Sequence, residues 1–60
     1  MNRSDALQRC YELALKVAHT GIGGENSREL EDLARMYDIF VIYTDVGIVV
    51  EDRMARYTFR

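Results

Sequence analysis

The chain has 60 residues, a formal net charge of −2, one cysteine and one histidine. These numbers exclude an intramolecular disulfide and a zinc site of Cys and His ligands within one chain, and they give no general attraction to nucleic acid or anionic lipid. A chain of this size buries only ~60% of the surface that its unfolded form exposes. We therefore expect one domain over residues 1–60 whose stability benefits from association.

No targeting segment or membrane span is expected. The residues that follow Met1 are polar, and no apolar run approaches the ~18 residues that cross a bilayer. The expected location of the protein is the cytoplasm.

A first helix is expected between Ser4 and Gly21. Ser4 is a plausible N-cap, and apolar residues follow it at the spacing of one helical face. Further apolar residues, Leu13 and Leu15 among them, widen this stripe, which predicts a helix covered on more than one side. Glycine destabilises a continuing helix, so the helix should stop at Gly21.

A second helix is expected after Gly24. Asn26 and Glu29 have the spacing of a capping box, and Ser27 is the alternative N-cap. A narrow apolar stripe follows, formed by Leu30, Leu33, Ala34 and Tyr37. This pattern predicts an amphipathic helix.

Three strands are expected after the helices. The run Ile39–Tyr43 is continuously apolar, which predicts a strand with both faces buried. Turn residues at 45–47 lead to a second strand over Ile48–Val50. Residues 54–60 alternate between apolar and polar, as a strand with one solvated face does. The sequence therefore predicts an α+β fold with two N-terminal helices followed by a small three-stranded antiparallel sheet.

The order of these strands leads to a prediction about assembly. Consecutive strands usually neighbour one another, so the simplest sheet places residues 48–50 in the middle and the apolar strand 39–44 at an edge. An exposed apolar edge recruits other chains. Two short helices can cover one face of the sheet, so the other face, which carries either Phe40 and Ile42 or Ile39, Val41 and Tyr43, also requires burial. Both arguments predict a homodimer that uses the apolar strand, the wide face of the first helix, or both. The alternative is a sheet order in which the apolar strand is central within one chain.

The glycine-rich segment between the helices is the first candidate binding site. Backbone N–H groups at the start of a helix, approached closely through glycine, can hold a phosphate or a carboxylate. The predicted ligand-binding residues are His19, Thr20, Gly21, Gly23, Gly24, Asn26, Ser27 and Arg28. The segment lacks the full spacing of known phosphate motifs, and Glu25 opposes an anion. The alternative is a simple connection between two helices.

The last eight residues contain three arginines and no acid, the only basic concentration in the chain. Alternation along a strand puts Arg56 and Arg60 on the face opposite Tyr57 and Phe59. The aromatic side chains are therefore expected in the core, and the arginines toward solvent or a partner. Because guanidinium groups suit phosphate and acidic protein surfaces, Arg56 and Arg60 are the second candidate site. An ordinary solvated strand face is the alternative.

No catalytic machinery is predicted. Cys10 and His19 would lie on opposite sides of the first helix, ~13 Å apart along its axis, and cannot form a dyad within one chain. Cys10 is expected to be a small buried hydrophobe. Glu25, Glu29 and Asp32 could gather near the start of the second helix, where acids are favourable without a metal ion. We expect neither enzymatic activity nor a cofactor.

These observations predict a non-enzymatic, homodimeric binding protein that holds or sequesters a small phosphorylated ligand of the nucleotide type, as a phage or mobile-element accessory protein could. The alternative is an inhibitor or adaptor that binds a host protein through the acidic second helix, a strand edge or the arginines. A small DNA-binding regulator is disfavoured by the net charge and by the ~7-residue interval between the helices, which is too long for a helix-turn-helix.

Overall fold

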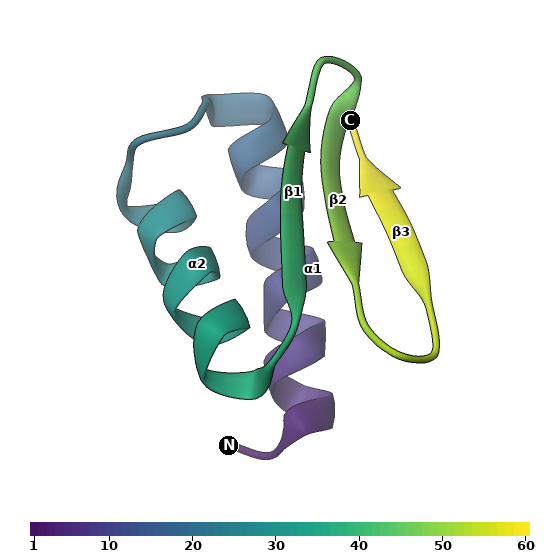
Figure 1. Ribbon diagram of the computed structural model, residues 1–60. Coiled ribbons are helices and arrows are strands. Elements are labelled where there is room, and N and C mark those ends of the chain that lie inside the picture. Colours follow the sequence, from purple (N-terminus) through teal and green to yellow (C-terminus); the bar gives the residue numbers. More distant parts are fainter.

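Two helices precede a three-stranded antiparallel sheet in the computed structural model, which describes residues 1–60 (Figure 1). The elements are α1 (Arg3–Thr20), α2 (Glu25–Tyr37), β1 (Phe40–Thr44), β2 (Gly47–Glu51) and β3 (Arg56–Phe59). The strand order is β1-β2-β3. The predicted α+β fold and the central position of residues 48–50 are therefore confirmed, and the alternative with a central apolar strand is wrong.

Helix α1 begins two residues before the predicted start of its first turn. Its N-cap is Asn2, whose side-chain oxygen accepts a hydrogen bond of 2.8 Å from the backbone N–H of Asp5. The predicted cap, Ser4, lies inside the helix, so that prediction is wrong. Asn is as good an N-cap as Ser, and the N–H three residues after Asn2 is one of those at the helix start that lack a backbone acceptor.

No helix of the chain combines the length and apolar character that a membrane crossing requires.

Helix α2 begins without a side-chain cap, because its N-cap is Gly24. Both predicted caps, Asn26 and Ser27, are therefore wrong. Ser27 is buried, and its Oγ accepts a hydrogen bond of 2.9 Å from the N–H of Gly23 and donates one of 3.0 Å to the carbonyl of Gly24. The hydroxyl therefore holds the turn before the helix rather than the first turn of the helix itself.

One hydrophobic core lies between the two helices and the inner face of the sheet. Helix α1 packs against α2, β2 and β3, which confirms that it is covered on more than one side. Helix α2 contacts β1 in addition to α1. The buried core residues are Cys10, Leu13, Ala14, Val17, Leu30, Ala34, Ile39, Ile48 and Val50. Full burial of a side chain such as Leu13 contributes roughly 1.5–3 kcal/mol relative to exposure.

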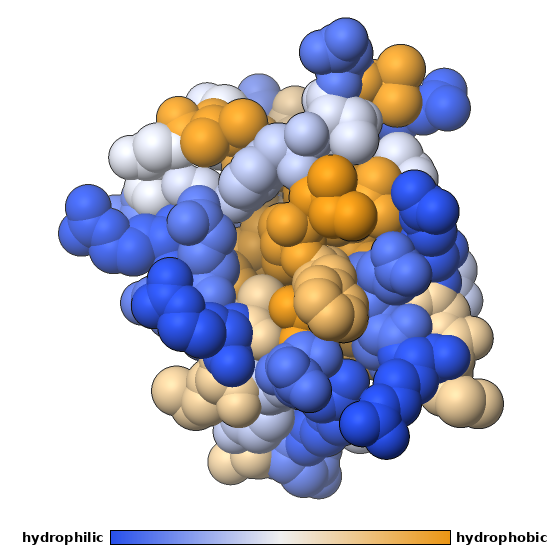
Figure 2. Space-filling model, in the orientation of Figure 1, coloured by the Kyte–Doolittle hydropathy of each residue, from blue (hydrophilic) through white to orange (hydrophobic).

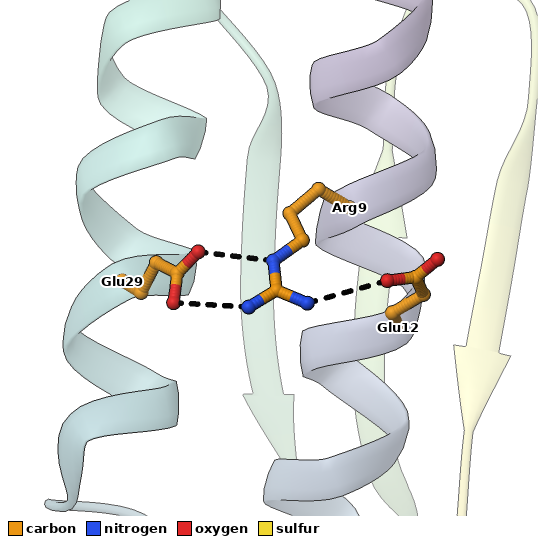
Figure 3. Close-up of polar contacts among 3 residues, drawn as sticks. All are labelled: Arg9, Glu12 and Glu29. Carbon is orange, nitrogen blue, oxygen red and sulfur yellow. Dashed lines mark hydrogen bonds and ion pairs between the residues drawn. The ribbon is translucent and has the colours of Figure 1, made fainter.

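Arg9 links the two helices (Figure 3). Its Nε donates to Glu29 Oε2 at 3.0 Å and its Nη2 to Glu29 Oε1 at 3.3 Å, while its Nη1 donates to Glu12 Oε1 at 3.3 Å. These hydrogen bonds, first of all that with Glu29, raise the pKa of Arg9. The predicted capping partner of Asn26 is thus used between helices, since α1 offers Glu29 a bidentate donor at the same level.

Only one face of the sheet is covered. Both helices lie on the same side of the strands, behind the sheet in Figure 1 or beside it. Phe40 and Ile42 project from the other face and expose 64% and 43% of their surface. Within one chain, therefore, only the inner face of the apolar strand is buried, and burial of its other face by a second copy stays a prediction. The inward residues of the apolar run 39–43 face the helices, and its outward residues are covered by neither helix.

The two edges of the sheet differ. Helix α2 contacts β1 and lies on the side of β1 away from β2 (Figure 1), and the hydroxyl of Tyr43 donates to Glu31 of α2 at 2.8 Å. A flanking helix is one device that protects an edge strand from other chains. No strand pairs with the far side of β3. Both β1 and β3 are thus edge strands paired on one side only, and α2 flanks the edge of β1 alone.

Candidate functional site

The glycine segment uses part of its backbone for its own structure. The N–H of Gly21 bonds to the carbonyl of Val17 at 2.8 Å, and the N–H of Gly23 bonds to Ser27. Gly21 and Gly23 have φ of 99° and 103°, a region that glycine enters without steric cost. Two of the amides expected to hold an anion are thus occupied. The hydroxyl of the neighbouring Thr20 donates to the carbonyl of Lys16 at 2.8 Å.

Two of the predicted ligand residues meet across the molecule. Gly21 and Arg60 line a groove of about 330 Å³ between the end of α1 and the β1–β2 turn. Its apolar wall includes Val17 and Ile48 from the core. Asp45 lines the same groove, so it carries one acidic and one basic side chain.

The other predicted arginines lie elsewhere. Arg28 lines a second groove of about 400 Å³ along α2, together with Glu25, Glu29 and Asp32. Acids outnumber the arginine there, so this groove does not suit an anion. Arg56 is paired across the strands with Glu51, at the end of β3 opposite to Arg60. The ten predicted ligand residues therefore do not form one site.

Cys10 and His19 lie in different surroundings on α1. Cys10 is fully buried, which confirms its predicted place in the core. Burial, followed by the charge of Glu29, raises the pKa of the Cys10 thiol and so disfavours the nucleophilic thiolate. His19, which the helical spacing separates from Cys10, is exposed near the C-terminal end of α1. No three His, Cys, Asp or Glu side chains are grouped so that they could hold a metal ion.

The uncovered side of the sheet offers a different kind of surface. We call it the outer face and define it by Phe40 and Ile42 of β1, Val49 and Glu51 of β2, and Arg56 and Thr58 of β3, which the strand register aligns in two rows. Figure 2 looks onto this side and shows an apolar area over the strands with hydrophilic residues on both sides of it. The outer face thus has an apolar centre and a polar rim, the composition of many protein interfaces.

Val49 shows how the outer face is built. It exposes only 4% of its surface although no helix covers it. Its cross-strand neighbours are Ile42 on one side and Thr58 on the other. Directly opposed side chains in a sheet lie close enough to shield one another. The apolar centre is therefore already packed laterally, and its exposed part is the tops of Phe40 and Ile42.

The aromatic residues of β3 are less buried than predicted. The ring centroid of Tyr57 lies 5.2 Å from that of Tyr11 at an interplanar angle of 78°, and Phe59 lies 5.6 Å from Tyr11. Phe59 packs against the core, but Tyr57 exposes 53% of its surface. The inner side of β3 is thus an aromatic shelf, defined by Tyr11, Tyr57 and Phe59, that is open toward the free edge.

The sequence predicted a sheet face that the helices leave uncovered, and the structure shows that this face carries Phe40 and Ile42. Its signal was present, because Phe40 and Ile42 alternate with Val41 and Tyr43 in the apolar run. The sequence did not indicate the side of the sheet on which both helices pack.

Comparison with known proteins finds no relative: no family model, curated protein or solved structure matches the chain. The fold and surfaces define a small α+β protein with one sheet face left uncovered.

Proposed function

We propose that this chain is a non-enzymatic binding protein that works by covering its outer face with another protein. The observation that carries the proposal is the exposure of Phe40, at 64%, beside Ile42 on a face that neither helix touches. Exposed apolar residues that are grouped, rather than scattered, are typical of interaction surfaces. The predicted inhibitor or adaptor of a host protein is the form of this proposal that we favour.

The exposed side chains can contribute substantially to binding. Full burial of a Phe or Ile side chain is worth roughly 1.5–3 kcal/mol, and about half of each is still exposed here. Covering both would therefore contribute about 2 kcal/mol, and 1.4 kcal/mol corresponds to a factor of ten in affinity. Truncation of Phe40 alone should weaken a complex by roughly tenfold.

The test compares two single substitutions in affinity purification from cells that contain the protein's partners. Phe40→Ser removes the largest side chain of the outer face, and Met36→Ser is the matched control, because Met36 is exposed by 71% on α2. We expect partners to be retained by wild type and Met36→Ser and lost by Phe40→Ser. Retention by all three proteins, or capture by none, would contradict the proposal.

The predicted homodimer is a special case in which the partner is a second copy. Sedimentation equilibrium tests it on the purified chain. A dimer that Phe40→Ser dissociates and Met36→Ser preserves would identify the outer face as the dimer interface. A monomer at all micromolar concentrations would leave the outer face to a different protein and remove the homodimer.

A small phosphorylated ligand is the second candidate, and the meeting of Gly21 and Arg60 in one groove favours it. The volume of about 330 Å³ lies at the lower end of the range for ligand pockets. Calorimetric titration with a panel of nucleotides tests this candidate. Binding that is lost in Arg60→Gln and kept in Arg28→Gln would support it, and absence of binding by wild type would remove it.

A further inference from the structure

We propose that the free edge of β3 accepts an extended segment of a partner protein in which acidic and apolar residues alternate. This inference rests on the proposed function, since it names the chemistry of the partner and the place where its backbone docks. An extended segment that adds to a sheet edge gains main-chain hydrogen bonds for affinity and side-chain contacts for specificity.

The backbone of β3 supplies the first part of the argument. Strand β3 pairs with β2 only, and none of the remaining backbone hydrogen bonds outside the regular elements involves residues 56–59. Alternate N–H and C=O groups of an edge strand point away from the sheet and are free to pair. The β1 edge is unpaired as well, but α2 flanks it (Figure 1) and residues 40–44 contain no basic side chain, so an acidic segment is favoured at β3.

The outer side of the β3 edge favours acidic residues in the partner segment. Arg56 lies on the outer face, and Arg60 continues the same alternation one residue beyond the strand. The only ion pairs of the chain are those of Arg9, so Arg56 and Arg60 form none, although Glu51 is the cross-strand neighbour of Arg56 and Asp45 lines the groove with Arg60. A strand added to β3 would place every second side chain beside these two guanidinium groups. Asp or Glu at those positions would form charge-assisted hydrogen bonds with them.

The inner side of the β3 edge favours apolar residues in the partner segment. Tyr57 is half exposed there, with its ring against Tyr11 and beside Phe59. The intervening side chains of an added strand would lie over this aromatic shelf and extend the core by one strand. Aromatic pairs and aromatic–aliphatic pairs across strands are favourable. The two sides together specify a segment in which acidic residues alternate with apolar ones.

A second copy of this chain does not fit the same edge. Antiparallel pairing of two β3 strands centred on Thr58 would place Arg56 of one copy directly opposite Arg60 of the other. Like charges opposite one another destabilise a strand pair. In any register, moreover, residues 53–60 of a second copy contain no acid, so the acidic strand belongs to a different protein.

The experiment is a selection from a library of random peptides, each long enough for one strand, on three forms of the intact chain. These are wild type, Arg56→Glu/Arg60→Glu, and the matched control Arg28→Glu/Arg35→Glu, which reverses two exposed arginines of α2. We expect wild type and the control to enrich peptides with alternating acidic and apolar residues. Charge reversal on β3 should weaken binding of the best peptide by roughly tenfold or more, the scale of two exposed ion pairs lost and replaced by repulsion.

Hydrogen exchange on wild type locates the bound peptide, and this measurement does not depend on how the variants fold. Slower exchange of alternate backbone amides in residues 56–59 is expected on binding, as in strand addition. Enrichment of neutral or basic peptides, indifference to the β3 charge reversal, protection of another element, or no enrichment would each overturn the inference. A peptide that depends on Phe40 but not on Arg56 and Arg60 would overturn it while leaving the proposed function intact.

Discussion

Gly47 is the position where a single methyl group should damage the sheet most. Gly47 has a φ of 150°, in a region that residues with a Cβ rarely enter. A Cβ built there would lie well inside van der Waals contact of the backbone carbonyl oxygen of Phe59 and 3.1 Å from the carbonyl carbon. Both atoms belong to the backbone, so they can yield only if the end of β3 moves away from β2.

The expected cost of Gly47→Ala has two parts. A non-glycine residue at positive φ costs roughly 1–2 kcal/mol, and forcing an extra carbon into a packed site typically costs about 1–3 kcal/mol. The sum is about 2–5 kcal/mol. A domain of this length has a total stability of roughly 3–9 kcal/mol. At the middle of both ranges, Gly47→Ala removes about half of the stability.

Urea denaturation followed by circular dichroism measures this loss. Gly21→Ala is the matched control, because Gly21 also has a positive φ, of 99°, but a Cβ there meets no atom within 4 Å. The control should show the conformational cost alone, roughly 1–2 kcal/mol. Equal losses for the two variants would refute the argument, since they would show that the backbone of Phe59 absorbs the clash without cost.

Three further predictions test the core, a buried hydroxyl and a helix start. Leu13→Ala should cost about 2–5 kcal/mol in urea denaturation, because the side chain is fully buried; a loss below about 1 kcal/mol would contradict this. Burial, followed by the hydrogen bond to Glu31, raises the pKa of Tyr43 to about 12. Tyr43 therefore contributes stability that is present below its ordinary pKa of about 10 and is lost as the pH rises toward 12. Burial also raises the pKa of Tyr11, so phenolate absorbance should show more than one late-titrating tyrosine, of which Tyr43→Phe removes one and Glu31→Gln shifts that one downward. Gly24→Ser should raise the thermal midpoint slightly, because it adds the side-chain cap that α2 lacks, worth a few tenths of a kcal/mol; a lower midpoint would show that Ser27 already fulfils this role.

The elements could be predicted from the sequence because their periods differ clearly. Helical spacing up to Ala18, the glycines after it and the β-branched run from Ile39 each restrict the backbone locally. The helix starts could not be predicted as well. Asn2 and Ser4 are equally good N-caps, and the choice between them depends on where the first turn of the helix begins.

The candidate site was harder to predict because it depends on long-range placement. Residues near Gly21 were grouped by their closeness in the chain, but Arg28 faces the acids of α2 and Arg56 lies at the far end of β3. Only Arg60 returns to the groove beside Gly21. A periodic pattern tells which residues share a face, and it does not tell which face the helices choose.

The two faces of the sheet differ in what they contribute to folding. The inner face, with Ile48 and Val50, supplies the contacts on which both helices depend. Phe40 adds little to that core because most of its surface is exposed, so its removal should leave the stability nearly unchanged while it weakens a complex. Under the proposed function, folding depends on the inner face of the sheet, and the exposed apolar residues of the outer face are free to contact a partner. Substitutions on the outer face can test function without the loss of structure that makes core variants of a 60-residue chain difficult to interpret.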